Sequence, residues 1–221
     1  MIPGPAGPLR PIAVPRLLVV SDRFLLPLAR LPAVAERILE RVPPGTVGIY
    51  LREPGLPVRD LLEAAERLVE VAASRDRRAP VVVRARADLA LAAGAAGVQL
   101  QAHGAPPAEL RAAWPGLLLG YSAHALEEAA SVASQVDYLT FSPVFDVPGK
   151  GPPTGLAALA AACRAAGPTP VLALGGISGA ERAADARRAG AWGVAAIRAV
   201  LVAPDPAVAA VELLRALGTM I

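Results

Sequence analysis

Cysteine, asparagine and lysine are almost absent from this chain of 221 residues. Cys163 is the only cysteine, which excludes an intramolecular disulfide and a cysteine-rich zinc site. Because Cys163 lies in an alanine-rich helical stretch, we expect an inert thiol in the core. Asparagine does not occur, and Lys150 is the only lysine among the 22 basic residues. The remaining basic residues are arginines, which we interpret as a compositional bias.

Long apolar runs are missing as well. No uncharged apolar stretch reaches the roughly 18 residues that a membrane span needs. The first residues do not have the cationic start, apolar core and small-residue cleavage site of a secretory leader. We therefore expect no membrane partner and a cytoplasmic protein. Since 54% of the residues are hydrophobic and 19% are charged, intrinsic disorder is excluded.

The excess of basic charge is small, and aromatic residues are few. The net charge is +3, the arginines are scattered, and aromatic residues make up 4% of the chain. A nucleic-acid surface needs clustered positive charge, commonly with aromatic platforms on which bases stack. We expect no nucleic-acid partner.

What remains is a regular alternation that follows an irregular start. Residues 1–15 hold five prolines and two glycines, which predicts a flexible N-terminal arm. Residues 16–221 alternate short runs of Val, Leu and Ile with longer amphipathic stretches, which is typical of parallel strands and helices. The predicted strands are Leu17–Val20, Val47–Leu51, Val81–Val83, Gly97–Leu100, Leu117–Tyr121, Tyr138–Phe141, Val171–Leu174 and Val194–Ile197. The predicted helices are Leu31–Arg41, Val58–Ser74, Ala87–Ala93, Pro107–Trp114, Ala125–Ser134, Gly155–Ala166, Gly179–Ala189 and Ala207–Leu217.

Eight strand–helix units predict an α/β fold, a single (β/α)8 TIM barrel, with a doubly wound open sheet as the alternative. The C-terminal ends of barrel strands and the loops after them carry the functional residues. Gly175 and Gly176 follow the seventh strand and precede a helix, where backbone N–H groups can bind a phosphate. Arg198 follows the eighth strand and would add a charged donor. The alternative is a tight turn beside a solvated arginine.

The two histidines follow neighbouring strands. His124 lies after the fifth strand, where it could transfer protons near neutral pH or simply order the loop. His103 lies in a Gly/Ala/Pro loop, and we expect it to be solvated. A metal bound by both histidines would lack an evident acidic third ligand, so we predict no metal site.

Other charged residues also follow the strands. Lys150 lies in a Gly/Pro loop, where contact with an anion is a better prediction than a Schiff base, because that chemistry needs a desolvated amine. Arg52 and Glu53 could bind a carboxylate or pair with each other. Arg84 and Arg86 place positive charge after the third strand, which favours an anionic ligand over a divalent cation.

Several motifs, in order and at matching spacing, make residues 16–217 resemble the thiamine phosphate synthase/TenI family of small barrels. They include Val19–Arg23, Leu51–Glu53, Ala87–Ala95, Gly97–Leu100, Gly120–Ala129, Ser142–Phe145 and Leu174–Ile177. Members of this family often pair, so a homodimer stays open. The resemblance implies a phosphorylated thiazole as ligand, with Ser122, Gly175, Gly176, Ile177 and Arg198 in its pocket. It further implies substrate-binding roles for Arg52 and Lys150.

The chain departs from the synthase pattern at its metal and pyrophosphate residues. Where synthases have Gln-Leu-Arg-Glu-Lys, this chain has Tyr50-Leu51-Arg52-Glu53-Pro54. Where synthases have two magnesium-binding aspartates, it has Ala85 and, near the fourth strand, Gly104. Where synthases have two threonines before a lysine, Val147 and Gly149 precede Lys150, and Arg198 replaces a common serine.

These departures lead us to expect a TenI-like thiazole tautomerase without a cofactor, in which His124 is the acid/base. The first alternative is a thiamine phosphate synthase that joins a pyrimidine pyrophosphate to a thiazole phosphate with magnesium. The second alternative is a phosphate-ligand binding or regulatory protein without catalytic activity.

Overall fold

Eight parallel strands close into a barrel in the computed structural model, which describes residues 13–221. Each strand pairs with its sequence neighbours, and Leu17 of β1 lies beside both Val47 of β2 and Val194 of β8. The predicted (β/α)8 barrel is confirmed, and the open sheet is wrong. The strands are β1 (Leu17–Val20), β2 (Val47–Leu51), β3 (Val81–Arg84), β4 (Gly97–Leu100), β5 (Leu118–Ala123), β6 (Tyr138–Phe141), β7 (Val171–Leu174) and β8 (Gly193–Ala196).

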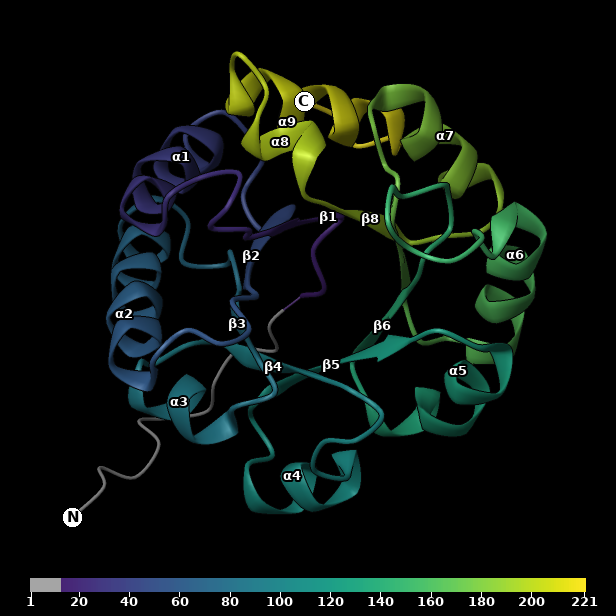
Figure 1. Ribbon diagram of the computed structural model, residues 1–221, viewed down its shortest axis with the longest axis horizontal. Helices are drawn as coiled ribbons and strands as arrows, with labels where there is room; N and C mark the ends of the chain where they lie inside the picture. Colours follow the sequence, from purple (N-terminus) through teal and green to yellow (C-terminus); the bar gives the residue numbers. More distant parts are fainter. Residues whose placement is uncertain (1–12) are drawn as a thin grey trace.

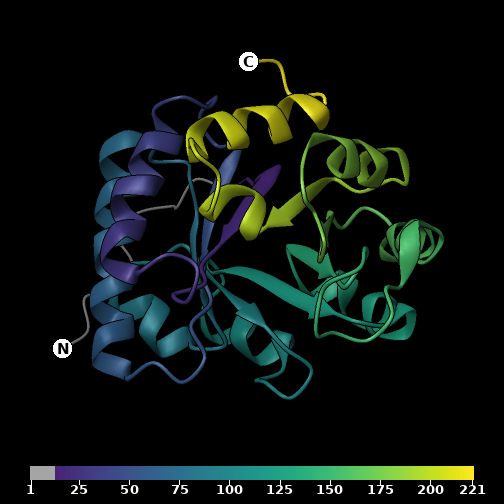
Figure 2. The same ribbon diagram turned by 45° about the horizontal axis from the view of Figure 1, so that its top comes forward.

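Helices surround the barrel as an outer ring (Figure 1). They are α1 (Leu31–Leu39), α2 (Val58–Arg75), α3 (Ala87–Ala92), α4 (Pro107–Ala113), α5 (Leu126–Val132), α6 (Gly155–Ala166), α7 (Ala180–Arg188), α8 (Arg198–Leu201) and α9 (Pro206–Ala216). Two short 3-10 helices, η1 (Leu28–Arg30) and η2 (Ala133–Gln135), precede α1 and follow α5. Both α8 and α9 lie between α1 and α7 in the ring, as a second view also shows (Figure 2).

Two differences from the prediction matter for the site. The strand predicted to end at Tyr121 continues to Ala123, because Ser122 and Ala123 pair with Thr140 and Phe141 of β6. Ser122 therefore lies within a strand and not in the following loop. The sequence prediction also missed α8, a helix of four residues that begins at Arg198. So short a helix leaves no apolar periodicity in the sequence.

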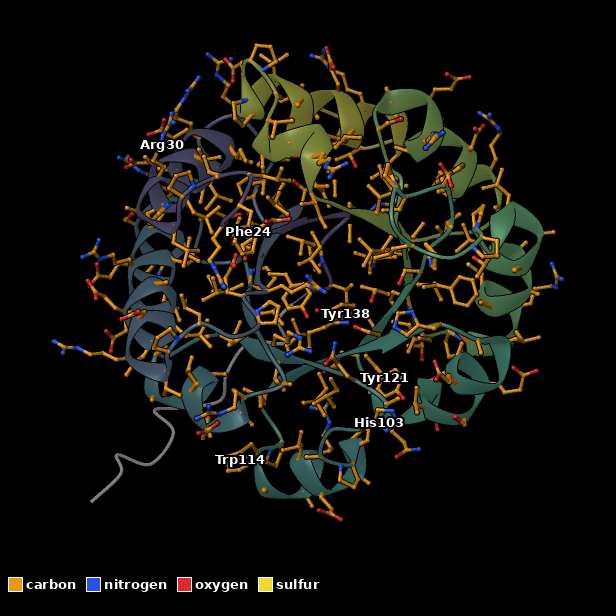
Figure 3. All side chains as sticks on the ribbon, viewed as in Figure 1. Phe24, Arg30, His103, Trp114, Tyr121 and Tyr138 are labelled. Carbon is orange, nitrogen blue, oxygen red and sulfur yellow. The ribbon has the colours of Figure 1, made fainter. Side chains whose placement is uncertain are left out.

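Alternation along each strand divides the core into two layers. Leu17 and Val19 belong to the larger cluster, which lies between the barrel and its helices, whereas Leu18 and Val20 belong to a smaller cluster inside the barrel. The inner cluster comprises Leu18, Val20, Tyr50, Val82, Leu118, Tyr138, Leu172 and Ala195. Figure 3 shows Tyr138 inside the ring of strands. The interior of the barrel is thus filled with side chains.

The beginning of the chain is described only in part. Of the expected arm at residues 1–15, residues 1–12 lie outside the described residues. The backbone carbonyl of Val14 accepts a hydrogen bond from the Trp192 indole Nε1 at 3.2 Å, just before β1 begins. No helix among residues 13–221 is long and apolar enough to cross a membrane.

Substituting Gly97 will test how tightly the strands approach one another. A Cβ atom at Gly97 would lie 2.1 Å from the backbone oxygen of Leu118 on β5, so Gly97→Ala forces two strands apart. We expect a loss of about 3 kcal/mol or more in the free energy of unfolding, measured by chemical denaturation followed by circular dichroism. Gly151→Ala is the control, because nothing lies within 4 Å of its added Cβ. Equal stability of the two variants would contradict the packing described here.

The single thiol gives a pH-dependent prediction. Cys163 lies half-buried on α6, and burial raises the pKa of its thiol to about 11. The folded protein will therefore keep the unreactive thiol form up to about pH 10 and form thiolate only above it. At about pH 8, we expect alkylation by iodoacetamide, followed by mass spectrometry, to be roughly 100-fold slower in the folded protein than in urea. Equal rates in the two states would refute the effect of burial.

Candidate functional site

A buried polar network closes the bottom of the barrel mouth. The Gln99 amide Nε2 donates to Ser122 Oγ at 3.1 Å and to Thr140 Oγ1 at 3.2 Å. The Tyr138 hydroxyl donates to Gln99 Oε1 at 2.6 Å. Because Gln99 is fully buried and its amide is satisfied on both sides, it holds three strands in register beneath the site. Ser122, predicted to bind ligand, is part of this network and is buried.

His124 follows β5 and is fixed by two neighbouring elements. Its ring Nδ1 lies 2.9 Å from the backbone oxygen of Ser142, and its backbone N–H donates to Glu128 Oε2 at 2.7 Å. A carbonyl oxygen can only accept, so Nδ1 carries the proton when the ring is neutral. Nε2 is then the ring nitrogen that can accept a hydrogen bond or a proton. Glu128 lies in the first turn of α5, and its carboxylate accepts the backbone N–H of a residue before the helix, as the glutamate of a capping box does. This bond keeps the loop in place.

The loops after β7 and β8 provide donors for an anion. No hydrogen bond from the backbone N–H groups of Gly176, Ile177 and Ser178 occurs within residues 13–221, and the same is true of Ile197 and Arg198. N–H groups with free donor capacity at the C-terminal end of a barrel are a common phosphate site. The Arg198 side chain begins α8 and is exposed beside them. The residues expected to form a phosphate pocket therefore follow two neighbouring strands, β7 and β8.

Packing against neighbouring backbone requires glycine at positions 175 and 176, whether or not a ligand binds there. Their φ angles are 95° and 67°, in the left-handed region that glycine favours. A Cβ at Gly175 would lie 2.7 Å from Pro143 Cα, and one at Gly176 would lie 2.6 Å from the backbone oxygen of Asp146. The two glycines thus let the β7–α7 loop pack directly on the β6–α6 loop.

The alternative in which Arg52 pairs with Glu53 does not occur. Glu53 is buried and accepts hydrogen bonds from Ser21 Oγ at 2.6 Å and from the backbone N–H of Arg23 at 3.3 Å. The Arg23 guanidinium lies 3.6 Å from the same carboxylate. Glu53 therefore joins the ends of β1 and β2. Within residues 13–221 the Arg52 guanidinium has no hydrogen-bond or ion-pair partner.

Arg84 lies at the end of β3 and crosses to the loop after β4. Its Nη2 donates to Gln101 Oε1 at 2.5 Å, while its buried Nε has no hydrogen-bond partner within residues 13–221. Both Arg52 and Arg84 act on the Tyr50 hydroxyl: burial raises the pKa of Tyr50 to about 12, and the two positive charges oppose that rise. The two guanidinium groups therefore share the side of the mouth formed by β2 and β3.

The other predicted cations lie apart. Arg86 pairs with Asp88 of α3 through bonds of 2.8 and 2.6 Å, and this contact raises the pKa of Arg86 and lowers that of Asp88. Its charge is largely compensated. Lys150 is exposed in the turn that follows Val147, and His103 is exposed in the loop before α4. The structure does not bring these three side chains to the buried floor of the mouth.

Sequence reasoning missed the residues that support the site. Thr140 and Tyr138 were predicted only as parts of a strand, and Gln99 and Gln101 only as residues near the end of the fourth strand, without partners. A detectable signal was present, since Gln99 and Thr140 are polar residues in the middle of short apolar strands. Buried polar groups require partners, so such residues on neighbouring strands predict one another.

The residues of the mouth do not fit the magnesium site that the resemblance implies for synthases. Magnesium prefers carboxylate and water oxygens, yet the two implied positions hold Ala85 and Gly104. No group of three or more His, Cys, Asp or Glu residues within residues 13–221 could hold a metal ion. In place of a ligand, Arg84 presents a guanidinium with a free buried N–H.

Ala85 keeps a backbone conformation that suits another residue. Its φ is 53°, the only positive φ of a non-glycine residue in the described chain. Asparagine and aspartate populate this left-handed region several-fold more often than other residues do. The backbone at the end of β3 thus keeps a conformation that aspartate adopts more readily than alanine, at the position that the resemblance gives to an aspartate.

Replacing Ala85 will measure that strain. Ala85→Gly removes the clash between Cβ and backbone, so we expect a gain of about 1 kcal/mol in the free energy of unfolding, since left-handed residues cost about 1–2 kcal/mol. Chemical denaturation measures the change. Ala102→Gly, in an exposed loop position without a positive φ, is the control and should not be stabilised. A destabilised A85G variant would contradict the strain.

The chain is similar to proteins named thiamine-phosphate synthase. The family model described as "Thiamine monophosphate synthase" matches residues 17–200. A thiamine-phosphate synthase of Anaeromyxobacter dehalogenans is 43% identical over 174 residues, 76% of each chain. A putative thiamine-phosphate synthase of Geobacter sulfurreducens is 40% identical over 196 residues, 86% of this chain and 88% of the relative. The solved thiamine phosphate pyrophosphorylase of Pyrococcus furiosus superposes with a TM-score of 0.78 and 29% identity, covering 92% and 95% of the two chains.

The expectation of a TenI-like tautomerase is wrong. Relatives that are 37–43% identical over much of the chain are named thiamine-phosphate synthases, which supports the first alternative instead. The expectation gave too much weight to the missing aspartates. His124 could not separate the two activities, because the resemblance implies this histidine in synthases as well.

Proposed function

The chain belongs to the thiamine monophosphate synthase family, and from this premise we propose that it joins a pyrimidine pyrophosphate to a thiazole phosphate. The observation that carries the proposal is the similarity to thiamine-phosphate synthases over most of the chain. In this reaction the lone pair of the thiazole nitrogen forms a bond to the pyrimidine methylene carbon. The bond from that carbon to oxygen breaks, and its electron pair leaves with pyrophosphate.

Two separate anion sites at the mouth fit two phosphorylated substrates. Arg52 directly follows β2, Arg84 ends β3, and the free N–H groups of Gly176 and Ile177 lie after β7. In a barrel of eight strands, β3 and β7 are four strands apart and lie on opposite sides of the mouth. We assign the thiazole phosphate to the β7–β8 side and the pyrophosphate to the β2–β3 side.

On the β7–β8 side, the backbone binds the thiazole phosphate. Gly175, Gly176 and Ile177 form the loop that presents the donors, and Arg198 supplies positive charge at the start of α8. A phosphate held between fixed N–H groups places the thiazole ring over the centre of the mouth. This positioning lowers the entropic part of the barrier for a reaction between two substrates.

On the β2–β3 side, positive charge stabilises the leaving group. Negative charge grows on the departing pyrophosphate as the bond to carbon breaks, and fixed cations stabilise it without reorganisation. Arg52 is retained from the family motif, and its guanidinium is free to make this contact. Lys150, in the exposed β6–α6 loop, would approach the same anion from the solvent side.

His124 would position the reacting substrates. Ring Nε2 accepts hydrogen bonds, because Nδ1 donates to the Ser142 carbonyl. The coupling step transfers no proton, so we assign His124 the role of accepting a hydrogen bond from a substrate N–H group. Ser122 supports this arrangement from below through the Gln99 network.

Formation of thiamine phosphate tests the proposed function. Purified protein is mixed with the pyrimidine pyrophosphate and the thiazole phosphate, and the product is detected as fluorescent thiochrome after oxidation, with magnesium added in one series and EDTA in the other. We expect turnover in at least one series. Arg52→Gln should lower kcat/KM roughly 100-fold or more, because it removes charge that stabilises the transition state.

The control variant is Arg59→Gln, on the exposed first turn of α2, which should retain wild-type kcat/KM. Absence of product in both series, with the protein folded by circular dichroism, would refute the proposed function. Equal activity of R52Q and wild type would refute the role of Arg52.

A further inference from the structure

We propose that Arg84 takes the place of the divalent cation at the pyrophosphate side of the mouth, so that this chain binds pyrophosphate without metal. The inference rests on the proposed function and names the group that neutralises its leaving anion. It follows from the disagreement between the family's metal ligands and the residues that this chain has.

The residues at this side of the mouth carry a different net charge from the implied metal site. The positions that the resemblance gives to two magnesium-binding aspartates hold Ala85 and Gly104. Two carboxylates and one divalent cation carry no net charge, whereas Ala85, Gly104 and Arg84 together carry one positive charge. The exchange therefore leaves the net charge of the site no less positive, which favours an anion.

Arg84 lies at the end of β3 with part of its guanidinium unpaired in the described chain. Arg84 follows Val83 on β3, one residue before Ala85, and Gln101 Oε1 accepts from its Nη2 at 2.5 Å. This bond occupies one donor on one nitrogen of the guanidinium. The buried Nε has no protein partner within residues 13–221, and a buried N–H without a partner is costly. A turn of the guanidinium toward an oxyanion at the mouth would satisfy that donor.

The described residues around Arg84 do not neutralise its charge. Arg52 lies on the adjacent strand without a partner in the described chain, and both guanidinium groups act on Tyr50. The nearest carboxylate at the end of β2, Glu53, is already used by Ser21 and Arg23. Asp22 accepts the backbone N–H of Phe24 at 3.0 Å. No carboxylate within residues 13–221 pairs with Arg52 or Arg84, so both charges remain available.

A guanidinium has the charge and the donors that binding of pyrophosphate requires. It is permanently charged and presents planar pairs of N–H donors that match phosphate oxygens. Arg52 and Arg84 together offer such donors from two neighbouring strands. The left-handed backbone at Ala85 turns the chain directly after Arg84, at the end of β3.

Binding of inorganic pyrophosphate tests the inference apart from turnover. Calorimetry on the full chain measures its Kd in EDTA and again with magnesium. We expect binding in EDTA at least as tight as with magnesium. Arg84→Gln should weaken binding in EDTA roughly 10- to 100-fold, the effect of losing a hydrogen bond to a charged group.

Arg86→Gln is the matched control. It lies two residues further along and pairs with Asp88, so we expect it to change the Kd by less than about threefold. Circular dichroism and the thermal midpoint verify that both variants are folded. The variant R84N/A85D/G104D restores the implied metal ligands, and we expect its pyrophosphate binding to require magnesium.

Two results would overturn the inference: wild-type binding that appears only with magnesium, or an R84Q variant that binds as tightly as wild type. Failure here is distinguishable from failure of the proposed function. Product formation that requires magnesium, with no binding in EDTA, removes the inference and keeps the synthase. Metal-free binding that depends on Arg84, without product, keeps the inference and removes the synthase.

Discussion

Alternation of side chains along eight short parallel strands is the constraint on which the structure depends. Each strand has only about four to six residues, and successive residues face the helices or the barrel interior. A shift of one residue in any strand would exchange the two layers. Gln99 is satisfied only when Ser122, Thr140 and Tyr138 all face inward, so the polar network and the closed register support each other.

The same alternation determines the chemistry of the mouth. Tyr50 and Arg52 are two residues apart on β2 and at its end, and Val82 and Arg84 have the same relation on β3. The apolar interior therefore ends in a layer of cations on this side. Across the barrel, the loops after β7 and β8 present backbone N–H groups, which carry partial positive charge. The mouth thus offers positive charge in two ways, arginine side chains on one side and main-chain N–H groups on the other.

Most of the fold could be predicted from the sequence, because the apolar runs of Leu17–Val20, Tyr138–Phe141 and Val171–Leu174 coincide with observed strands. The short helix α8 and the last two residues of β5 could not, since they depend on tertiary pairing. The site was less predictable. The positions of Gly175, Gly176 and His124 followed from their place after strands, but the partner of Arg84 is a glutamine from another loop. The activity was misjudged because the two missing aspartates received more weight than the motifs that the chain shares with synthases.

The contact between the glycine pair and the preceding loop limits how this barrel can diversify. Gly175 and Gly176 lie against the backbone of residues 143–146, so that part of the β6–α6 loop is built into the scaffold. The segment from Val147 to Pro153 makes few such contacts and reaches solvent. Insertions and deletions can therefore accumulate only in the second half of the loop, next to Lys150. Changes in substrate preference during evolution, or by loop grafting, would enter through that half, while residues 143–146 are inherited together with the glycine pair.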